Sequence, residues 1–125
     1  MDDVRAVSPV YETDPVGGVE QDAFLNIVVE VHTILSPSAL LDRCQQLEAA
    51  AERVREVRWG PRTLDVDVVW IDGFTSNEPV LTVPHPRAHE RNFVMVPLLD
   101  LDPSLEISGY DPETAFGQVH NLGPL

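Results

Sequence analysis

The sequence predicts one domain that mixes strands with helices, and three observations support this. The chain has 125 residues, of which 43% are hydrophobic. That is enough for one compact core and too little for two. Two stretches rich in β-forming residues, 5–13 and 24–35, precede a segment with the apolar spacing of a helix. We therefore assign residues 1–125 to a single domain.

The first elements predict an antiparallel pair of strands. Residues 5–13 (RAVSPVYET) and 24–35 (FLNIVVEVHTIL) have the composition of strands. The intervening DPVGGVEQDA contains Pro, Gly-Gly and Asp, which are typical of an irregular loop.

A helix follows, in SPSALLDRCQQLEAAAERV. Ser36 is a suitable N-cap and Pro37 a suitable first helical residue. Leu40, Cys44, Leu47 and Ala51 recur at helical spacing. Cys44 is the only cysteine, so an internal disulfide is excluded, and we interpret it as a small buried hydrophobe rather than a nucleophile.

The second half of the chain is predicted to contain shorter elements separated by turns. Gly60-Pro61 interrupts regular structure, residues 63–71 predict a strand, and Asp72-Gly73 predicts a turn. Residues 78–86 predict an extended segment, and 87–96 a short helix that ends near Pro97. Residues 104–125 form a weakly patterned C-terminal tail.

The overall charge excludes several classes of partner. A net charge of -13 and a pI of about 4.4 do not attract nucleic acid or anionic lipid. No apolar run approaches the roughly 18 residues of a membrane span, and the N-terminus does not resemble a signal peptide. We expect a soluble, cytoplasmic protein.

The positive charge is nevertheless concentrated locally. All eight basic residues are arginines, and six of them lie between Arg53 and Arg91. The planar guanidinium group matches phosphate or carboxylate in a bidentate way. The alternative is a compositional preference for arginine together with a solvated helix end.

Asp65 and Asp67 follow the arginines directly. On a strand, residues two apart project to the same side, so the two carboxylates stand together. A hard divalent cation such as Mg²⁺ would relieve their repulsion. An exposed strand face, where water screens the two charges, is the alternative.

The arginines, the aspartate pair and Trp59, which could stack on a flat ring, lie on both sides of the Gly60-Pro61 break. Together they indicate phosphoryl-transfer chemistry, in which a protein supplies position and charge. The chain contains no G-x-x-x-x-G-K-[ST] motif, so the site would fall outside the P-loop class.

Four runs make the resemblance specific: YETDPVGG, FLNIVV, RVREVRWGPRTLDVDVV and LTVPHPRAHERNFVMVPL. In order, from about Val7 to Pro103, they closely resemble the 6-hydroxymethyl-7,8-dihydropterin pyrophosphokinase family of folate biosynthesis. The resemblance implies an α+β fold with a ferredoxin-like antiparallel sheet on which helices pack. It also implies transfer of pyrophosphate from ATP to 6-hydroxymethyl-7,8-dihydropterin, with release of AMP and with two Mg²⁺ ions, by a monomeric protein.

The resemblance also implies residue roles. The residues matched to metal binding are Asp65 and Asp67, and those matched to catalysis are the same pair with Arg53 and Arg62. The residues matched to the ATP site are Gln45, Glu48, Arg55, Trp59, Val68, Thr82, His85 and Arg91. The residues matched to the pterin pocket are Thr13, Asp14, Val16, Phe24, Asn26 and Phe93.

Some of these residues have ordinary structural interpretations. An amide such as Asn26 within a strand needs partners, which a heterocycle could provide, but an edge-exposed Asn is equally consistent. Phe24 and Phe93 could simply belong to the core. His85 and His89 suggest zinc, but H-x-x-x-H without further ligands favours a phosphate-contacting His85 instead.

One departure from the family pattern is large. The strand and helix that begin family members, ahead of the strand near Arg5, are missing from this sequence. In the family sheet that strand lies between the strands holding Asn26 and Asp65, so we expect open edges and self-association. Two alternatives therefore stay open: a non-catalytic truncated remnant or interaction module of the same family, and a Mg²⁺-dependent transferase acting on another heterocycle.

Overall fold

A computed structural model of the protein describes residues 3–13, 24–53 and 64–125. The chain divides into two compact units, Met1–Thr33 with Arg87–Leu125 and Ile34–Pro86. Its helices and antiparallel strand pairs confirm the α+β class. In the described residues, no helix is both long and apolar enough to cross a membrane.

The first unit begins with an antiparallel ribbon in two parts. β1 (Asp3–Val7) pairs with β4 (Val29–His32), and β2 (Tyr11–Thr13) pairs with β3 (Phe24–Asn26). The predicted pairing of the two N-terminal segments is therefore confirmed. Each predicted strand, however, is divided into two short ones.

Ser8 and Pro9 account for the division. Pro9 has no N–H group and cannot continue a strand ladder. Ser8 replaces the missing pairing with two bonds to one residue: its N–H donates to the Val28 carbonyl at 2.9 Å, and its Oγ accepts from the Val28 N–H at 2.9 Å. The buried serine thus joins the two halves of the ribbon with its polar atoms satisfied.

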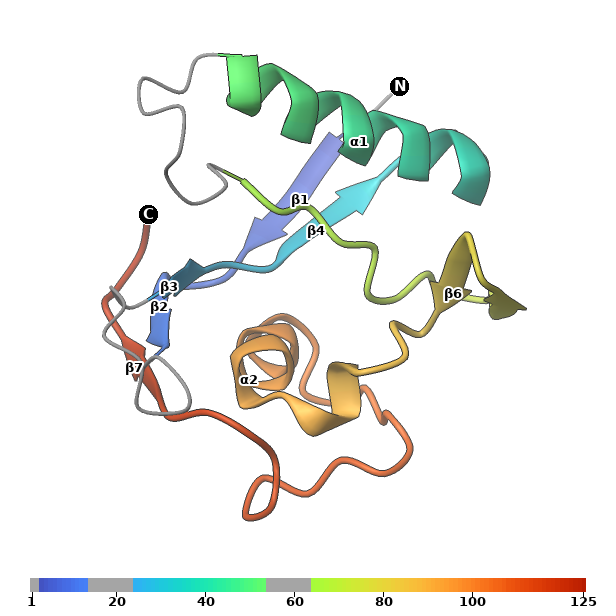
Figure 1. Ribbon diagram of the computed structural model, residues 1–125. Helices are drawn as coiled ribbons and strands as arrows, with labels where there is room; N and C mark the ends of the chain where they lie inside the picture. The colour runs from blue at the N-terminus through green and yellow to red at the C-terminus, as the bar shows by residue number, and fades with distance from the viewer. Residues whose placement is uncertain (1–2, 14–23, 54–63) are drawn as a thin grey trace. The chain divides into compact units, whose positions relative to one another are not determined.

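β2 lies between two strands, as Figure 1 shows. β7 (Val119–Asn121) pairs antiparallel with its second edge, which places Thr13 opposite both Phe24 and Val119. The C-terminal tail, for which the sequence showed little pattern, therefore adds a strand to the sheet.

Beside this sheet stand a 3₁₀ turn, η1 (Ala88–Glu90), and helix α2 (Asn92–Leu101), which packs against β2 and β7. The predicted end of the helix near Pro97 is wrong, because Pro97 lies inside α2. A proline within a helix costs roughly 3 kcal/mol. Met95, Pro97 and Leu98 are all buried, and burying large apolar side chains contributes about 1.5–3 kcal/mol each, which is enough to offset that cost.

The second unit contains the predicted helix, α1 (Pro37–Arg53). Ser36 Oγ accepts a hydrogen bond from the Ala39 N–H at 3.2 Å, which confirms Ser36 as the N-cap. Cys44 is 8% exposed, as expected for a buried hydrophobe. Leu47, expected on the same buried stripe, is 50% exposed, and Glu48 is partly buried in its place.

The predicted strand over 63–71 is not formed by residues 64–70. A strand requires a partner, and none of the described residues forms a ladder with this stretch. The Asp72-Gly73 turn is confirmed, with Gly73 at φ 72° and a bridge between Ile71 and Phe74.

The same unit ends in a hairpin of β5 (Ser76–Glu78) and β6 (Leu81–Val83). β6 lies within the segment predicted to be extended, 78–86, and β5 overlaps it only at Glu78.

Candidate functional site

Two predicted pterin-pocket residues meet in the first unit. Asn26 on β3 donates a hydrogen bond from Nδ2 to Thr13 Oγ1 on β2, at 2.7 Å. Thr13 is 3% exposed, whereas Asn26 is only partly buried. The contact occupies one donor of the Asn26 amide and leaves its carbonyl oxygen and second N–H for another partner.

Phe93, a third predicted pterin residue, lies near the same place. An ideal Cβ built on Gly117 would be 3.5 Å from Phe93 Cδ1 and 3.6 Å from Thr13 Cγ2, so both side chains border one glycine. The Arg91 guanidinium carbon lies 5.5 Å from the centre of the Phe93 ring, within cation–π range. Phe24 pairs with Thr13 across the strands and is 52% exposed, so it is not a core residue.

In the second unit, Asp65 and Asp67 are both exposed, whereas Val66 and Val68 are partly buried. Over residues 65–68 this pattern is compatible with a same-side placement of the two carboxylates, although Leu64 is exposed as well and the segment forms no strand. Paired, exposed carboxylate oxygens are the ligands that a hard cation such as Mg²⁺ takes, with water or phosphate completing its shell. The residues present therefore fit a magnesium site.

Helix α1 anchors this segment through Glu48, whose Oε1 accepts a hydrogen bond from the Val66 N–H at 2.7 Å. Glu48 thus fixes the backbone between the two aspartates.

Cys44, on the same helix, is not a candidate nucleophile. Burial raises the pKa of the Cys44 thiol, and the negative charges of Glu48 and Asp67 raise it further. A buried thiol with a raised pKa is a poor nucleophile.

Two further predicted ATP-site residues of this unit, Thr82 and His85, lie on or just after β6. The His85 N–H donates to the Val69 carbonyl at 2.9 Å, which joins the chain after β6 to the aspartate segment. Thr82 Oγ1 donates to the Glu78 carbonyl at 2.9 Å and so serves the β5–β6 hairpin. Gln45 is exposed on α1.

Several predicted site residues cannot be placed. Asp14, Val16, Arg55, Trp59 and Arg62 lie outside the described residues, and Arg53 is described only as the last residue of α1. The described pterin residues and Arg91 belong to the first unit, and the described metal and remaining ATP-site residues to the second. Among the described residues, no cluster of three or more His, Cys, Asp or Glu side chains could hold a metal.

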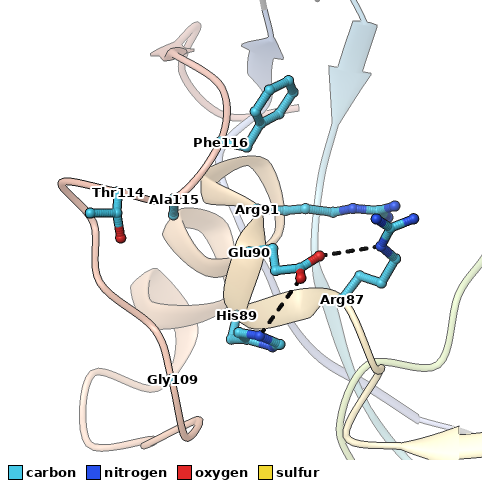
Figure 2. A pocket seen from close by; sticks show the side chains of 8 residues that line it. All are labelled: Arg87, His89, Glu90, Arg91, Gly109, Thr114, Ala115 and Phe116. Atoms are coloured by element: carbon cyan, nitrogen blue, oxygen red, sulfur yellow. Dashed lines mark hydrogen bonds and ion pairs between the residues drawn. The ribbon is translucent and has the colours of Figure 1, made fainter.

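A cavity of about 470 Å³ lies in the first unit (Figure 2). One side is formed by residues around η1, and the other by residues 109–116 of the C-terminal segment. Glu90 Oε2 lies 3.2 Å from Arg87 Nε, and Glu90 Oε1 lies 4.0 Å from His89 Nε2. Arg91, a predicted ATP-site residue, also lines the cavity.

Sequence reasoning overlooked Asn92 and the C-terminal wall of this cavity. Asn92 lies between two predicted site residues, and its side chain contacts the carbonyls of residues 112, 115 and 117. A polar residue at the start of an otherwise apolar helix was the available signal. The C-terminal segment offered none, because neither its composition nor its periodicity is distinctive.

Comparison with known proteins shows the family of this chain. The family model described as 7,8-dihydro-6-hydroxymethylpterin-pyrophosphokinase (HPPK) matches residues 1–103. A Bacillus subtilis protein named 2-amino-4-hydroxy-6-hydroxymethyldihydropteridine pyrophosphokinase is 46% identical over 111 residues, covering 89% of this chain and 66% of that protein. A Methylorubrum extorquens protein of the same name is 42% identical over 120 residues, covering 96% and 76%.

A third protein of that name, from Pseudomonas aeruginosa, is 45% identical over 102 residues, covering 82% of this chain and 63% of that protein. The chain thus spans about two thirds of the length of the curated relatives it matches. The family model covers most of the chain, including every predicted site residue. This chain therefore belongs to the 7,8-dihydro-6-hydroxymethylpterin-pyrophosphokinase family.

Proposed function

We propose that this protein transfers a pyrophosphoryl group from ATP to 6-hydroxymethyl-7,8-dihydropterin and releases AMP, a step of folate biosynthesis. Proteins that share 42–46% of their aligned residues with it carry the name of that activity. The physical support comes from two groups of side chains, one suited to a heterocycle and one to a magnesium–polyphosphate.

The first unit supplies the groups for the pterin. The Asn26 amide, oriented by Thr13, offers a donor and an acceptor to the edge of a flat ring. Phe24 and Phe93 offer ring faces for stacking. Asp14 and Val16 complete the proposed pocket, and both lie outside the described residues.

The second unit supplies the groups for the nucleotide. Asp65 and Asp67 would hold Mg²⁺, as two ions in our proposal, which would neutralise charge on the ATP phosphates. Gln45, Glu48, Val68, Thr82 and His85 form the described part of the proposed ATP site. Arg53, Arg55, Trp59, Arg62 and Arg91 complete it.

The chemical step follows from this arrangement of charge. The pterin hydroxymethyl oxygen forms a bond to the β-phosphorus of ATP, while that phosphorus loses its bond to the oxygen bridging to the α-phosphorus. AMP departs with that oxygen, and the hydroxymethyl proton passes to solvent. The chain's contribution is alignment of the two substrates and stabilisation of negative charge by its arginines.

The observation that carries the proposal is the shared exposure of Asp65 and Asp67 within a family-matched segment. The test is to incubate the purified chain with Mg²⁺, ATP and 6-hydroxymethyl-7,8-dihydropterin and to separate the products by chromatography. We expect AMP and the pterin diphosphate in equal amounts, and neither without the pterin. Formation of ADP in place of AMP, or AMP formed equally well with unrelated heterocycles, would reject the proposed reaction.

We further propose that the described strands belong to a ferredoxin-like sheet in one domain, and that the active form is a monomer in equilibrium with self-associated chains. The strand pairings β1–β4 and β2–β3 are compatible with such a sheet. In that sheet a strand would lie between β3 and residues 64–70.

A second candidate is a non-catalytic interaction module of the same family. It is favoured by one observation: residues 64–70 pair with none of the described strands. An unsupported segment would hold Asp65 and Asp67 less rigidly than catalysis requires. A chain that binds ATP and pterin but forms no AMP would favour this candidate.

A further inference from the structure

The C-terminal segment, residues 109–121, is held against the start of α2. The Phe116 N–H donates to the Glu90 carbonyl at 2.7 Å, and the Asn92 N–H donates to the Phe116 carbonyl at 2.9 Å. Arg91 and Phe116 form a parallel bridge between these bonds. The segment therefore pairs with the backbone on either side of Arg91.

The Asn92 side chain fastens the same segment. Its Nδ2 lies 3.2 Å from the carbonyl oxygens of both Ala115 and Gly117, and 3.4 Å from that of Pro112. Its Oδ1 accepts a hydrogen bond from the Tyr110 hydroxyl at 2.9 Å. One partly buried amide thus holds four residues of the segment, and these bonds use both its donor and its acceptor groups.

The segment then reaches the predicted pterin residues. Gly117 adopts φ +93° and borders both Phe93 and Thr13. β7 begins two residues later and pairs with β2, so that Val119 stands opposite Thr13. Thr13 in turn orients Asn26 from the other side. A shift of the segment would therefore move two side chains that border the proposed ring site.

We propose that the C-terminal segment positions the site for the flat heterocycle, with Asn92 as its anchor and Gly117 as the point of contact with Thr13 and Phe93. Neither Asn92 nor Gly117 contacts the heterocycle in this proposal; both are positioning residues. The inference rests on the proposed function, since it concerns the pterin that the function requires. It adds a role for residues beyond 103, where the family match ends.

A matched pair of glycines separates positioning from mere stability. Gly123 adopts φ +92°, nearly the value of Gly117, but nothing lies within 4 Å of the Cβ that an alanine would add. Gly117→Ala and Gly123→Ala therefore introduce similar backbone strain at two points of the C-terminal tail. Only Gly117→Ala adds a methyl group beside Thr13 and Phe93.

The experiment measures the dissociation constants of 6-hydroxymethylpterin and of a non-hydrolysable ATP analogue with Mg²⁺, by calorimetry on the 125-residue chain. We expect Asn92→Ala, which removes the hydrogen bonds of the anchor, to weaken pterin binding about 5- to 10-fold. Gly117→Ala places a methyl group in van der Waals contact with Thr13 and Phe93, and it should weaken pterin binding more than Gly123→Ala does. In Gly117→Ala and Asn92→Ala, the dissociation constant of the nucleotide analogue should change less than about 2-fold. In Gly123→Ala and in the exposed control Asn77→Ala, the dissociation constants of both ligands should change less than about 2-fold. Thermal melts accompany each measurement.

The outcomes separate the two proposals. Unchanged pterin binding in Gly117→Ala and Asn92→Ala would overturn the positioning role alone, as would equal losses in Gly117→Ala and Gly123→Ala. Parallel loss of pterin and nucleotide binding with a lowered melting temperature would also overturn it, because the segment would then serve only the fold. Failure of the unsubstituted chain to bind pterin would overturn the proposed function, and this inference with it.

Discussion

Asn26 donates a 2.7 Å hydrogen bond to Thr13 across two antiparallel strands. The two residues are thirteen positions apart in the sequence, and the pairing of β2 with β3 brings them together. The bond fixes the orientation of an amide that would otherwise rotate freely. Substitutions of Thr13, a buried residue, can therefore measure how much this hydrogen bond contributes to pterin binding.

Thr13→Val should weaken pterin binding by about 10-fold, because it removes the acceptor that orients Asn26 while it keeps the side-chain shape. Thr13→Ser retains the hydroxyl group and should stay within about 2-fold of the unsubstituted chain, since only a methyl group is lost. Calorimetric titration with 6-hydroxymethylpterin measures both. Similar affinities for the two variants would show that the hydroxyl group does not matter to the site.

Asp67→Asn should reduce AMP formation by at least about 100-fold, because it removes one of two charges proposed to hold Mg²⁺ while it keeps the side-chain size. Asp67 is exposed, so the melting temperature should change little. The matched control is Asp72→Asn, also exposed and in the same unit, because Asn-Gly forms the turn as well as Asp-Gly. Equal activity in the two variants would remove Asp67 from the metal site.

Arg62→Ala should lower kcat by roughly 100-fold with a smaller effect on KM, because its proposed charge acts on the transferring group. Arg62 lies outside the described residues, so this expectation comes from the sequence and the family resemblance. Arg58→Ala, in the same arginine-rich run but with no assigned role, is the control. Steady-state kinetics with varied ATP would distinguish the two parameters, and a change confined to KM would make Arg62 a simple binding contact.

The sequence predicted local structure best where one physical signal was dominant. Ser36 and Pro37 marked the start of α1, and Asp72-Gly73 marked a turn, because capping and turn formation depend on neighbouring residues. The division of the N-terminal ribbon into two strand pairs was harder to predict. Pro9 indicated an interruption, but the hydrogen bonds between Ser8 and Val28 join residues twenty positions apart.

Long-range packing explains the main failures. The helix continues through Pro97 because its neighbours are buried, a benefit that no local pattern displays. The stretch 64–70 has the alternation of a strand but pairs with no described strand, since pairing depends on a partner elsewhere. The shared exposure of Asp65 and Asp67 concerns residues only two positions apart, whereas the contacts of Asn92 span up to twenty-five positions.

Tyr11 provides a pH-dependent test of the β2–α2 packing. Its side chain is buried and its hydroxyl donates to Asp100 Oδ2. Burial, followed by the hydrogen bond and charge of Asp100, raises the pKa of Tyr11 from 10.0 to about 12. The folded protein therefore retains this proton above the pH at which an unfolded tyrosine releases it.

The sign of the resulting effect is fixed by linkage. The stability contributed by protonated Tyr11 is fully present below about pH 10 and is lost as the pH rises through about 12. Burial also raises the pKa of Tyr110, so both measurements use a Tyr110→Phe background. In urea titrations, additional Tyr11→Phe should lower stability by about 1 kcal/mol near neutral pH. Tyr11→Phe should also make the free energy of unfolding decline less steeply as the pH rises from about 10 to 12. An equally steep decline in both variants would assign the pH dependence to other groups.

The last prediction concerns the β1–β4 ribbon. All four residues of β4 are exposed, and Val4, Val29 and Val31 are each at least 40% exposed. Isolated two-stranded ribbons are marginal in water, and strand edges with exposed apolar side chains promote pairing between chains. We therefore expect the 125-residue chain to self-associate in a concentration-dependent way, as sedimentation velocity would measure.

Substitution can locate the association. Val31→Lys places a charge on β4 and should shift the chain toward monomer, because charged edge residues oppose pairing between sheets. Val80→Lys, at a 78% exposed position in the other unit, is the control for added positive charge on a net acidic chain. Equal shifts from both variants would attribute association to overall charge, and a monomer at all concentrations would show that the ribbon is stable by itself.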